Sequence, residues 1–490
     1  CFLDFGTLSE PLIVKVALSP VSVENAKANM EAENAAWDFE DVRSRAVEAW
    51  ESELANIRID GSEDQKAIFY TGLYHAYIQP NIVSDCNGDY TRSDYTTGRL
   101  PEGDTQYSTF SLWDTFRACN PLYTLLKPER VAQFVKSMLR QYDVYGYLPI
   151  WQLWGSENYC MIGNHAIPVV VDAALKGIPG VDSQRVYEAV RGTSLRDHRQ
   201  SPWSLLEQYG YLPENKQRES VSITLENAYD DACVARLAQA LGHTDDYQYF
   251  NRRAHLYRNL FDSGTGFFRA KDDKGQWMQP FNPYSYRPEG MHPYAEGNAW
   301  QYRFFVPHDV PDMVALMGGT KRFEQALDSL FTDNTRVDLD GGGNASGFIG
   351  QYAHGNEPSH HCTYLYHWAG APRKAQYYAN KVMTEQYFNR IDGYSGNEDC
   401  GQMSAWYIWS AMGFYPVDPA SGIYSFGSPQ LRRVEIRLPG GKTFTIETNR
   451  RGADDCYIKS VKLNGKRYTK PYITHDDIMQ GGTLQFVMTR

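Results

Sequence analysis

The feature that most constrains the fold is a long succession of helix-forming segments between residues 62 and 412. About a dozen segments with helical periodicity follow one another, and short runs of glycine or proline separate them. Some segments, such as 161–175, are apolar nearly all round, whereas others, such as 373–385, carry a charged face. This alternation of buried and amphipathic helices predicts a mainly α fold, the double-layered (α/α)6 toroid. An irregular helical bundle or solenoid is the alternative, because no repeat of fixed length is visible.

The two ends of the chain differ from this helical middle. Residues 1–18 have the pattern of extended segments, and residues 23–55 have the pattern of one or two amphipathic linker helices. Beyond Pro416, apolar and polar residues alternate, which predicts a small antiparallel β unit. Its strands could pair with strands near residues 2–18, because those first residues have few partners nearby. We therefore divide the chain into regions 1–60, 61–414 and 415–490.

Composition and charge exclude several classes of function. The formal net charge is −11, and no stripe of lysine and arginine is present that would follow a nucleic-acid backbone. No apolar stretch reaches the roughly 18 residues that a membrane-spanning helix needs, and the first residues lack the pattern of a signal peptide. The eight cysteines form no C-x-x-C pair, which excludes a zinc ribbon or a thioredoxin-type redox motif. We expect neither a nucleic-acid partner nor a transmembrane segment.

Carboxylates and amides concentrate at the predicted starts of four helices. Glu357 precedes a proline, which is tolerated at the first helical position, and Asp399 and Glu296 precede apolar or aromatic helical patterns. Asp114 lies three residues before Arg117 in a fourth segment. If these helices run parallel, their starts meet at one rim and their charged groups share one cavity, which helix capping alone does not predict. A further acidic run over 224–231 is interpreted as mainly structural.

The chemistry of such a rim indicates a glycosidase. A cavity with several carboxylates and no basic cluster suits a neutral polyol, and an acid and a base carboxylate are the usual apparatus for hydrolysing a glycosidic bond. The two carboxylates must differ in environment so that one stays protonated while the other ionises. Glu296, which lies near Trp300 in an aromatic segment, is the better candidate for a raised pKa and for the acid. Asp399, which lies among amides at a helix entrance, is the better candidate for the base.

Oxygen ligands at the same helix starts exceed what two-carboxylate chemistry requires. They are Asn298, Gln301, Asn356, Glu357, Asn397 and Glu398. Hard oxygen donors of this mixture select calcium over zinc, so we predict a bound divalent ion. His354, His360 and His361 could instead indicate zinc, but two of them are adjacent and would diverge on a helix. For each histidine, a hydrogen bond to a sugar hydroxyl or a place in the core is the stronger interpretation.

Four ordered motifs resemble those of glycoside hydrolase family 92. They are WDTFR at 113–117, YAEGNAWQ at 294–301, GQYAHGNEPSHH at 350–361 and GNEDCGQMSAW at 396–406, and the resemblance covers the chain from about Val14 onward. It implies a calcium-dependent exo-α-mannosidase that works with inversion. The expected substrates are terminal mannose units, most often α-1,2-linked, of N-glycans or mannans. The expected location is periplasmic, cell-surface or secreted.

The resemblance also implies a domain order and residue roles. An N-terminal β-sandwich is expected to precede the catalytic (α/α)6 barrel over 61–414, so that 1–60 would hold only the end of the sandwich and the linker helices, with the sandwich as a partner. Glu296 is expected to be the general acid and Asp399 the general base. Calcium is expected near Asn356, Glu357, Gln301, Asn298 and Asn397. The expected substrate-binding residues are Trp113, Asp114, Arg117, Trp300, His354, Gly355, Glu398 and His360.

Two other classes of function remain open at this point. A carbohydrate-binding protein could keep the pocket for a mannoside without hydrolysing it. A different (α/α)6 carbohydrate-active enzyme is the second alternative, either a glycoside phosphorylase or a polysaccharide lyase. The phosphorylase would need a basic phosphate site, and the lyase would favour anionic uronates, which the acidic rim disfavours.

Overall fold

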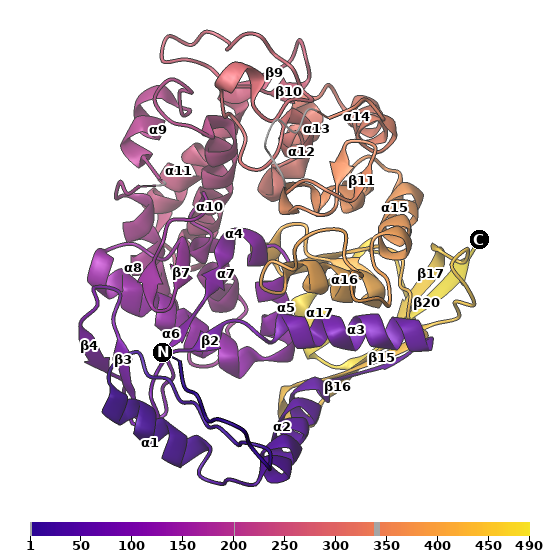
Figure 1. Cartoon of the computed structure of the whole chain (residues 1–490). Helices are drawn as coiled ribbons and strands as arrows, with labels where there is room; N and C mark the ends of the chain where they lie inside the picture. Colours follow the sequence, from indigo (N-terminus) through magenta and orange to yellow (C-terminus); the bar gives the residue numbers. More distant parts are fainter. Residues whose placement is uncertain (1, 200, 338–343) are drawn as a thin grey trace.

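The computed structural model describes residues 2–199, 201–337 and 344–490 (Figure 1). Two helices lead into the main body, α1 (Val23–Glu33) and α2 (Phe39–Leu54). The helices that follow are α3 (Glu63–Ala76), α4 (Leu112–Thr115), α5 (Cys119–Leu126), α6 (Pro128–Tyr145), α7 (Ala166–Leu175), α8 (Ser183–Ser194), α9 (Trp203–Tyr209), α10 (Ser220–Ala240), α11 (Thr244–Arg253), α12 (Ala299–Tyr302), α13 (Val310–Leu316), α14 (Thr320–Thr332), α15 (Pro372–Glu385), α16 (Gln402–Met412) and α17 (His475–Met479). The described 3-10 helices are η1 (Leu256–Leu260), η2 (Pro288–Gly290), η3 (Pro307–Asp309), η4 (Glu357–Ser359), η5 (Cys362–His367), η6 (Pro419–Ser421) and η7 (Pro439–Gly441).

Buried and amphipathic helices alternate in space as they do in the sequence. Nearly every residue of α7 is buried and every residue of α16 is, whereas α6, α8 and α15 bury one face only. The long helix α10 packs against α7, α8 and α11, and α16 packs against α3, α5 and α15. The predicted (α/α)6 toroid is therefore confirmed, with α4, α12 and α16 near the centre of the view in Figure 1.

Local sequence signals fix several helix ends. Pro128 occupies the first turn of α6, and Gly146 ends that helix with φ of 75°, a left-handed conformation that favours glycine. Ser62 and Gln65 form a reciprocal capping box at the start of α3. These signals explain where α3 begins and where α6 begins and ends.

Near the polar motifs, the helices that periodicity predicts are shorter in the structure. The sequence pattern predicts continuous helices over 358–369 and 296–306. The structure has only the short 3-10 segments η4 and η5 in the first range and the short helix α12 in the second. His360 and His361 explain part of the difference, because their Nε2 atoms bond to the backbone oxygens of His354 and Phe304, 2.9 Å away in both cases. Such tertiary bonds compete with a regular helical ladder.

Short two- and three-residue strands connect the helices. They are β2 (Asn81–Ile82), β3 (Asp89–Thr91), β4 (Thr97–Arg99), β5 (Tyr107–Ser108), β6 (Phe110–Ser111), β7 (Trp151–Leu153), β8 (Ser156–Glu157), β9 (Phe261–Asp262), β10 (Phe267–Phe268), β11 (Phe348–Ile349), β12 (Tyr352–Ala353), β13 (Phe414–Tyr415) and β19 (Tyr472–Thr474), with the four-residue β14 (Ile423–Phe426). The sequence pattern predicts a hairpin over 264–280. In the structure β10, which lies in this segment, pairs instead with β9, which precedes it, as an antiparallel hairpin.

The C-terminal β unit is a six-stranded sheet. Its order is β1 (Ile57–Asp60), β15 (Arg433–Arg437), β16 (Thr443–Thr448), β20 (Gly482–Thr489), β17 (Tyr457–Leu463) and β18 (Lys466–Tyr468). All neighbouring strands are antiparallel except β16 and β20, which run parallel. The sheet therefore departs from the purely antiparallel arrangement that was expected.

The N-terminal partner of this sheet also differs from the expectation. Described residues 2–18 form no strand, so the suggested pairing with them is wrong, and β1 pairs with β15 instead. Ile57 in β1 faces Ile436 across the pair, and both side chains are fully buried. Burial of these side chains favours β1, whereas residues such as Leu3 and Val16 remain exposed. Within the described residues, no helix has the length and apolar character to cross a membrane.

We predict that Ile57→Ala lowers the free energy of unfolding by about 2 to 5 kcal/mol, because it leaves a cavity where the sheet meets the helical body. Urea denaturation measures this change. Arg58→Ala is the matched control, since Arg58 lies next in the same strand with an exposed side chain, and its effect should stay within about 0.5 kcal/mol. Equal effects of the two substitutions would contradict the assignment of β1 to the core.

Candidate active site

Three of the four polar motifs bring carboxylates to one point. Asp114 comes from α4, Glu357 begins η4, and Asp399 lies in the segment before α16. Carboxylate oxygens of these three residues all lie within 4.8 Å of one another. The convergence that was predicted from four helix starts is thus present, although short helical turns and loops rather than long helices provide it.

Asp114 and Glu357 are the buried members of this acidic cluster. Burial raises the pKa of Asp114 well above its usual range, the charges of Asp399 and Glu296 add to the shift, and Arg117 opposes it. The hydroxyl of Ser111 donates a hydrogen bond to the Asp114 carboxylate. Burial and the charges of Asp114 and Asp399 likewise raise the pKa of Glu357. Each of these two carboxyls therefore tends to stay protonated unless a cation lies next to it and stabilises the ionised form.

Glu357 has the environment of a cation ligand. Its side chain is fully buried, and neither of its carboxylate oxygens has a hydrogen-bond partner among the described residues. A buried carboxylate without donors is costly, whereas a divalent ion would satisfy both oxygens. The all-oxygen character of the cluster fits calcium or magnesium rather than zinc.

Asp399 lies in a strained segment of backbone. Its φ is 51°, and the next two residues, Cys400 and Gly401, have φ of 56° and 104°. Left-handed conformations at residues other than glycine cost about 1 kcal/mol or more and are concentrated at functional sites. Burial, together with the charges of Glu296 and Glu398, raises the pKa of Asp399 to about 6. Asp399 is therefore less solvated than the sequence suggested, yet it is ionised above about pH 6.

Glu296 lies beside the acidic cluster with φ of 46°, another left-handed non-glycine residue. The Nδ2 atom of Asn356 donates hydrogen bonds to the Glu296 backbone oxygen at 3.0 Å and to its Oε2 atom at 3.3 Å. Asn356, which was expected to be a calcium ligand, therefore holds Glu296, which was expected to be the general acid. This contact joins the second and third motifs.

A contact between two glycines joins the third and fourth motifs. A Cβ atom on Gly396 would lie only 2.5 Å from the Cα atom of Gly355, and one on Gly355 would lie 2.8 Å from the backbone oxygen of Ser395. Only glycine permits this approach. Gly355 was expected to bind substrate, and the structure gives it this second role of bringing the segments of Glu357 and Asp399 together.

Arg117 is a cation close enough to the cluster to oppose the raised pKa values of Asp114 and Glu357. Its Nε atom donates to the backbone oxygen of Trp113 at 3.1 Å, and its guanidinium lies against the rings of Trp113, Phe116 and Phe305. Its two terminal nitrogens are buried without a partner among the described residues. Five donors in a fixed geometry suit the recognition of hydroxyls or carboxylates, so Arg117 is available for a ligand.

Glu398 points toward a different set of partners from Asp399. Its carboxylate lies 2.9 Å from Nδ1 of His75 and accepts hydrogen bonds from the hydroxyl and backbone nitrogen of Ser404 at 2.6 and 3.2 Å. The hydrogen bond that His75 donates to Glu398 raises the pKa of His75. Glu398 thus borders the cluster while its own charge is satisfied by the helices α3 and α16.

Two predicted substrate-binding histidines lie in the core. The ring nitrogens of His354 lie 2.8 and 2.7 Å from the hydroxyls of Tyr352 and Tyr387, and His360 lies between Gln402 and the backbone of His354. Both histidines are fully buried with both ring nitrogens occupied. This geometry matches the core interpretation that the sequence left open.

The remaining predicted residues also have structural partners. Asn298 and Gln301 form a capping box for α12, so their side-chain oxygens already accept backbone hydrogen bonds and do not turn to the cluster. Asn397 is exposed. Trp300 is buried against Phe267, and its Nε1 atom has no partner among the described residues.

A buried ionic network lies behind the cluster. Glu226 accepts hydrogen bonds from Trp113 Nε1 at 3.0 Å and from the Tyr302 hydroxyl at 3.1 Å, and its other oxygen lies 3.0 Å from Nε2 of His165. Nδ1 of His165 lies 2.9 Å from Asp230. The geometry agrees with the structural interpretation of the run 224–231. His165 itself was missed, because nothing in its local sequence indicates two distant carboxylate partners.

Glu219 is a further carboxylate that the sequence analysis did not identify. It precedes α10 with φ of 57°, and burial together with the charges of Glu226 and Glu296 raises its pKa to about 7. A carboxyl that is protonated near neutral pH is a candidate proton donor. Its position at a helix start, seven residues before Glu226, is the one local signal that could have identified it.

Comparison with known proteins identifies the family of this chain. The sequence matches the glycosyl hydrolase family 92 catalytic domain over residues 25–490. The structure of a family 92 α-mannosidase from Bacteroides thetaiotaomicron in complex with mannoimidazole is similar, with 39% identity and a TM-score of 0.92 over 96% of this chain and 62% of that one. A family 92 inverting mannosidase from Bacteroides thetaiotaomicron VPI-5482 has 35% identity and a TM-score of 0.86 over 96% and 65%.

A curated relative from Arthroderma benhamiae, described as an uncharacterized secreted glycosidase, is 27% identical over 97% of this chain and 60% of its own length. The chain thus spans between 60% and 65% of the length of these relatives.

We predict a pH-dependent contribution of His165 to stability. Burial lowers its pKa, but the charges and hydrogen bonds of Asp230 and Glu226 outweigh burial and raise the pKa to about 9. Because the folded pKa lies above the ordinary value, this stabilisation is complete below about pH 6.5 and is lost as the pH rises through about 9. The difference in unfolding free energy between the wild type and His165→Gln should shrink by roughly 3 kcal/mol between pH 6 and pH 10.

His308→Gln is the control for this measurement. Burial lowers the pKa of His308 to about 4, so this histidine stays neutral over the same range. Above about pH 7.5 this histidine is neutral in both the folded and the unfolded states, so the effect of His308→Gln on unfolding in urea should be independent of pH between pH 7.5 and pH 10. A pH-independent effect of His165→Gln would show that His165 is neutral in the folded protein.

Proposed function

The chain belongs to glycosyl hydrolase family 92, and on that premise we propose that it is an exo-acting α-mannosidase that inverts the anomeric configuration. The observation that carries the proposal is the convergence of Asp114, Glu357 and Asp399, with their oxygens within 4.8 Å of one another. Two similar structures are those of family 92 mannosidases, one of them in complex with mannoimidazole and the other described as inverting. We propose terminal α-1,2-linked mannose of N-glycans or mannans as the substrate and a secreted or periplasmic location.

Glu296 and Asp399 are the proposed acid and base. An inverting glycosidase needs one carboxyl to protonate the leaving oxygen and one carboxylate to activate a water molecule on the opposite face of the sugar. Asp399 is ionised above about pH 6 and can accept a proton from that water. Asn356 donates hydrogen bonds to the backbone oxygen and the carboxylate of Glu296. These bonds fix the orientation of the carboxyl group that would donate the proton.

Binding of the mannose unit is assigned to Asp114 and Arg117. The terminal nitrogens of Arg117, which have no partner among the described residues, are donors for sugar hydroxyls, and the Asp114 carboxylate in the acidic cluster is an acceptor. Trp113 supports both residues, because Glu226 fixes its ring and its backbone oxygen holds Arg117. We do not include His354 and His360 in the binding set, since their ring nitrogens are occupied.

The residues fit the calcium ion that the family resemblance implies. Glu357 would hold the ion, with Asp114 next to it, because both oxygens of Glu357 are buried without donors. Bound calcium would supply positive charge to the acidic cluster and a template for two neighbouring sugar hydroxyls. Asn298 and Gln301 are left out of the ligand set because they cap α12, and Asn397 is left out because it is exposed.

We predict that Glu296→Gln reduces kcat/KM on an α-1,2-mannobiose by about 100-fold or more, because the amide cannot protonate the leaving oxygen. On α-mannosyl fluoride, whose leaving group needs no proton, most activity should remain. NMR that resolves the anomers of released mannose gives both the rate and the configuration. Equal losses on the two substrates would remove Glu296 as the acid.

Glu219→Gln is the matched variant in this experiment. The charge of Glu296 contributes to the raised pKa of Glu219, about 7, so Glu219 is the alternative candidate for the acid. It should retain most of the activity on mannobiose. If Glu219→Gln instead shows the selective loss on mannobiose, the roles of the two residues are exchanged. Release of β-mannose as the first product is expected, and α-mannose would contradict inversion.

A second prediction concerns the metal. Calcium should raise the thermal unfolding midpoint of the chelator-treated wild type, because an ion that binds only the folded state stabilises it. Glu357→Gln should abolish this shift, and Asn397→Ala should preserve it. Calorimetric titration of the same variants with calcium checks the result without reference to activity. Retained calcium binding in Glu357→Gln, or its loss in Asn397→Ala, would contradict the proposed ligands.

A further inference from the structure

The hairpin of β7 and β8 lies beside the acidic cluster. Its strand β7 pairs with β6, and Trp151 is directly opposite Ser111. The hydroxyl of Ser111 donates a hydrogen bond to the Asp114 carboxylate, so this end of the hairpin borders the cluster. Burial, together with the charges of Asp114 and Glu296, raises the pKa of the Cys160 thiol, so the segment after β8 lies near the same carboxylates. The base of the hairpin is therefore one wall of the proposed active site.

The two faces of this hairpin differ. Gln152 lies on the face that packs on α6, where it is fully buried and its Nε2 atom donates to Gln141 at 2.8 Å. Trp151 and Leu153 lie on the opposite face, because side chains alternate along a strand. Residues paired directly across antiparallel strands project to the same side, so this is also the face of Ser111. Trp151 is half-buried and Leu153 is exposed, so an apolar surface leads outward from the acidic cluster.

Trp154 occupies the tip of the hairpin in a conformation that tryptophan rarely adopts. Its φ is 52° and that of Gly155 is 88°, so both residues of this two-residue turn have positive φ. Such turns favour asparagine followed by glycine, and a bulky residue at positive φ is strained. The Trp154 side chain is also 65% exposed, which leaves a large apolar ring in water. Strain of this kind is concentrated at functional sites, so Trp154 has the features of a ligand-binding residue.

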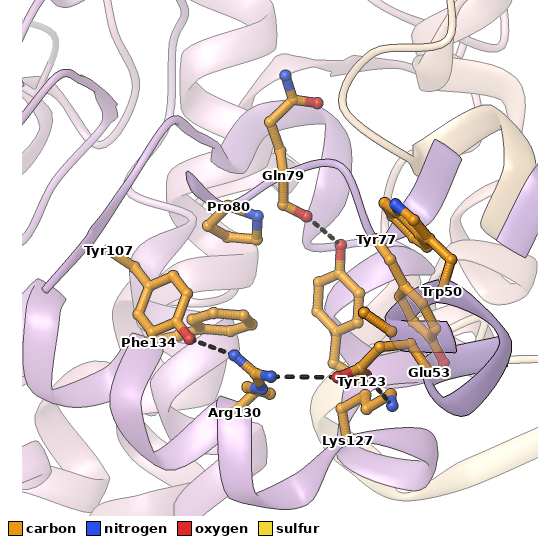
Figure 2. Close-up of a pocket in the computed structure, with 11 residues that line it drawn as sticks. Trp50, Glu53, Tyr77, Gln79, Pro80, Tyr107, Tyr123, Lys127, Arg130 and Phe134 are labelled. Atoms are coloured by element: carbon orange, nitrogen blue, oxygen red, sulfur yellow. Dashed lines mark hydrogen bonds and ion pairs between the residues drawn. The ribbon is translucent and has the colours of Figure 1, made fainter. Parts of the chain in front are cut away.

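Hydrogen bonds hold this tip against neighbouring segments. The backbone nitrogen of Gly155 donates to the Ser108 hydroxyl at 2.7 Å, and its backbone oxygen accepts from the Ser93 hydroxyl at 3.0 Å. Tyr107, which precedes Ser108 in β5, accepts a hydrogen bond from Arg130 of α6 at 2.7 Å in the wall of the pocket that Figure 2 shows. The turn is therefore fixed before a ligand binds, which lowers the entropic cost of binding.

On the basis of the proposed exo-acting hydrolysis, we infer that Trp151, Leu153 and Trp154 form an apolar platform for the sugar units on the leaving side of the scissile bond. The apolar C–H faces of pyranose rings pack on aromatic rings of this kind.

The direction of the hairpin selects the leaving side. An exo-acting enzyme encloses the terminal sugar, so only the leaving part of the glycan extends outward, and the general acid faces that part. The hairpin begins near Glu296, the proposed acid, and runs outward to its exposed tip. Trp154 lies three residues beyond Trp151, about 10 Å along the strand. It would therefore contact a sugar beyond the terminal mannose.

The kinetic test compares two substrates that differ in their leaving parts. Trp154→Asn should lower kcat/KM on an α-1,2-linked mannotetraose by about 10-fold, because the ring of the platform is lost. On α-mannosyl fluoride, whose leaving group is a single atom, kcat/KM should be unchanged. Asparagine is favoured at this turn position, so the variant should unfold in urea no more easily than the wild type. Trp37→Asn is the control, since Trp37 is 61% exposed outside the hairpin, and it should leave both rates unchanged.

A binding measurement separates the platform from the proposed hydrolysis. The full chain carrying Glu296→Gln, which should not consume the sugar, is labelled with 5-fluorotryptophan. The ¹⁹F resonance that disappears on adding Trp154→Asn belongs to Trp154. It should shift saturably with mannotetraose but not with methyl α-D-mannopyranoside, which is too short to reach it.

Three results would overturn the platform. They are no shift of the Trp154 resonance with mannotetraose, an equal shift with the monosaccharide, and equal losses on both substrates in Trp154→Asn. If the wild type hydrolyses neither substrate, the proposed function fails, and the ¹⁹F titration still decides whether Trp154 binds the glycan.

Discussion

The active-site region depends on the crowding of like charges in a buried space. Asp114, Glu357 and Asp399 bring carboxylate oxygens within 4.8 Å of one another, and burial raises the pKa of each. Such an arrangement is unfavourable by itself, so the surrounding structure must hold it together. Arg117 supplies part of the compensating charge, and the free oxygens of Glu357 leave a place for a cation.

Strained loops rather than helices provide the precise positions of these groups. Glu296, Asp399 and Cys400 all have left-handed backbones, and the glycines Gly355 and Gly396 allow two motif segments to touch. Regular helices could not bring their backbones this close, because a Cβ atom would intervene. The packing of the toroid, in which α10 and α16 are almost wholly buried, provides the stability that offsets this strain.

The network of Glu226, His165 and Asp230 connects that body to the site. It fixes Trp113 from behind, and Trp113 in turn holds Arg117 through its backbone oxygen. The charge of His165 between two carboxylates allows the network to remain buried, since an unpaired carboxylate there would be costly. The position of Arg117 therefore depends on buried residues that would not themselves contact a ligand.

The sequence by itself determined the helical toroid, the C-terminal β unit and the four motifs that meet at the site. Periodicity and turn residues are local properties, so they predicted α6, α15 and the strands β15, β16, β17 and β20 without any tertiary information. The order of the four motifs along the chain was sufficient to predict the family. The sequence failed where long-range contacts outweigh local preference, as in the short segments η4 and α12 and in the pairing of β1 with β15.

Only the tertiary structure decided what each polar residue contacts. It turned the amide of Asn356 toward Glu296, placed His354 and His360 in the core, and used Asn298 and Gln301 as helix caps. It also revealed Glu219, whose burial raises its pKa, and His165, whose carboxylate partners lie far away along the chain. The physical reason is that hydrogen-bond geometry and desolvation depend on neighbours in space, which a local pattern of residues does not contain.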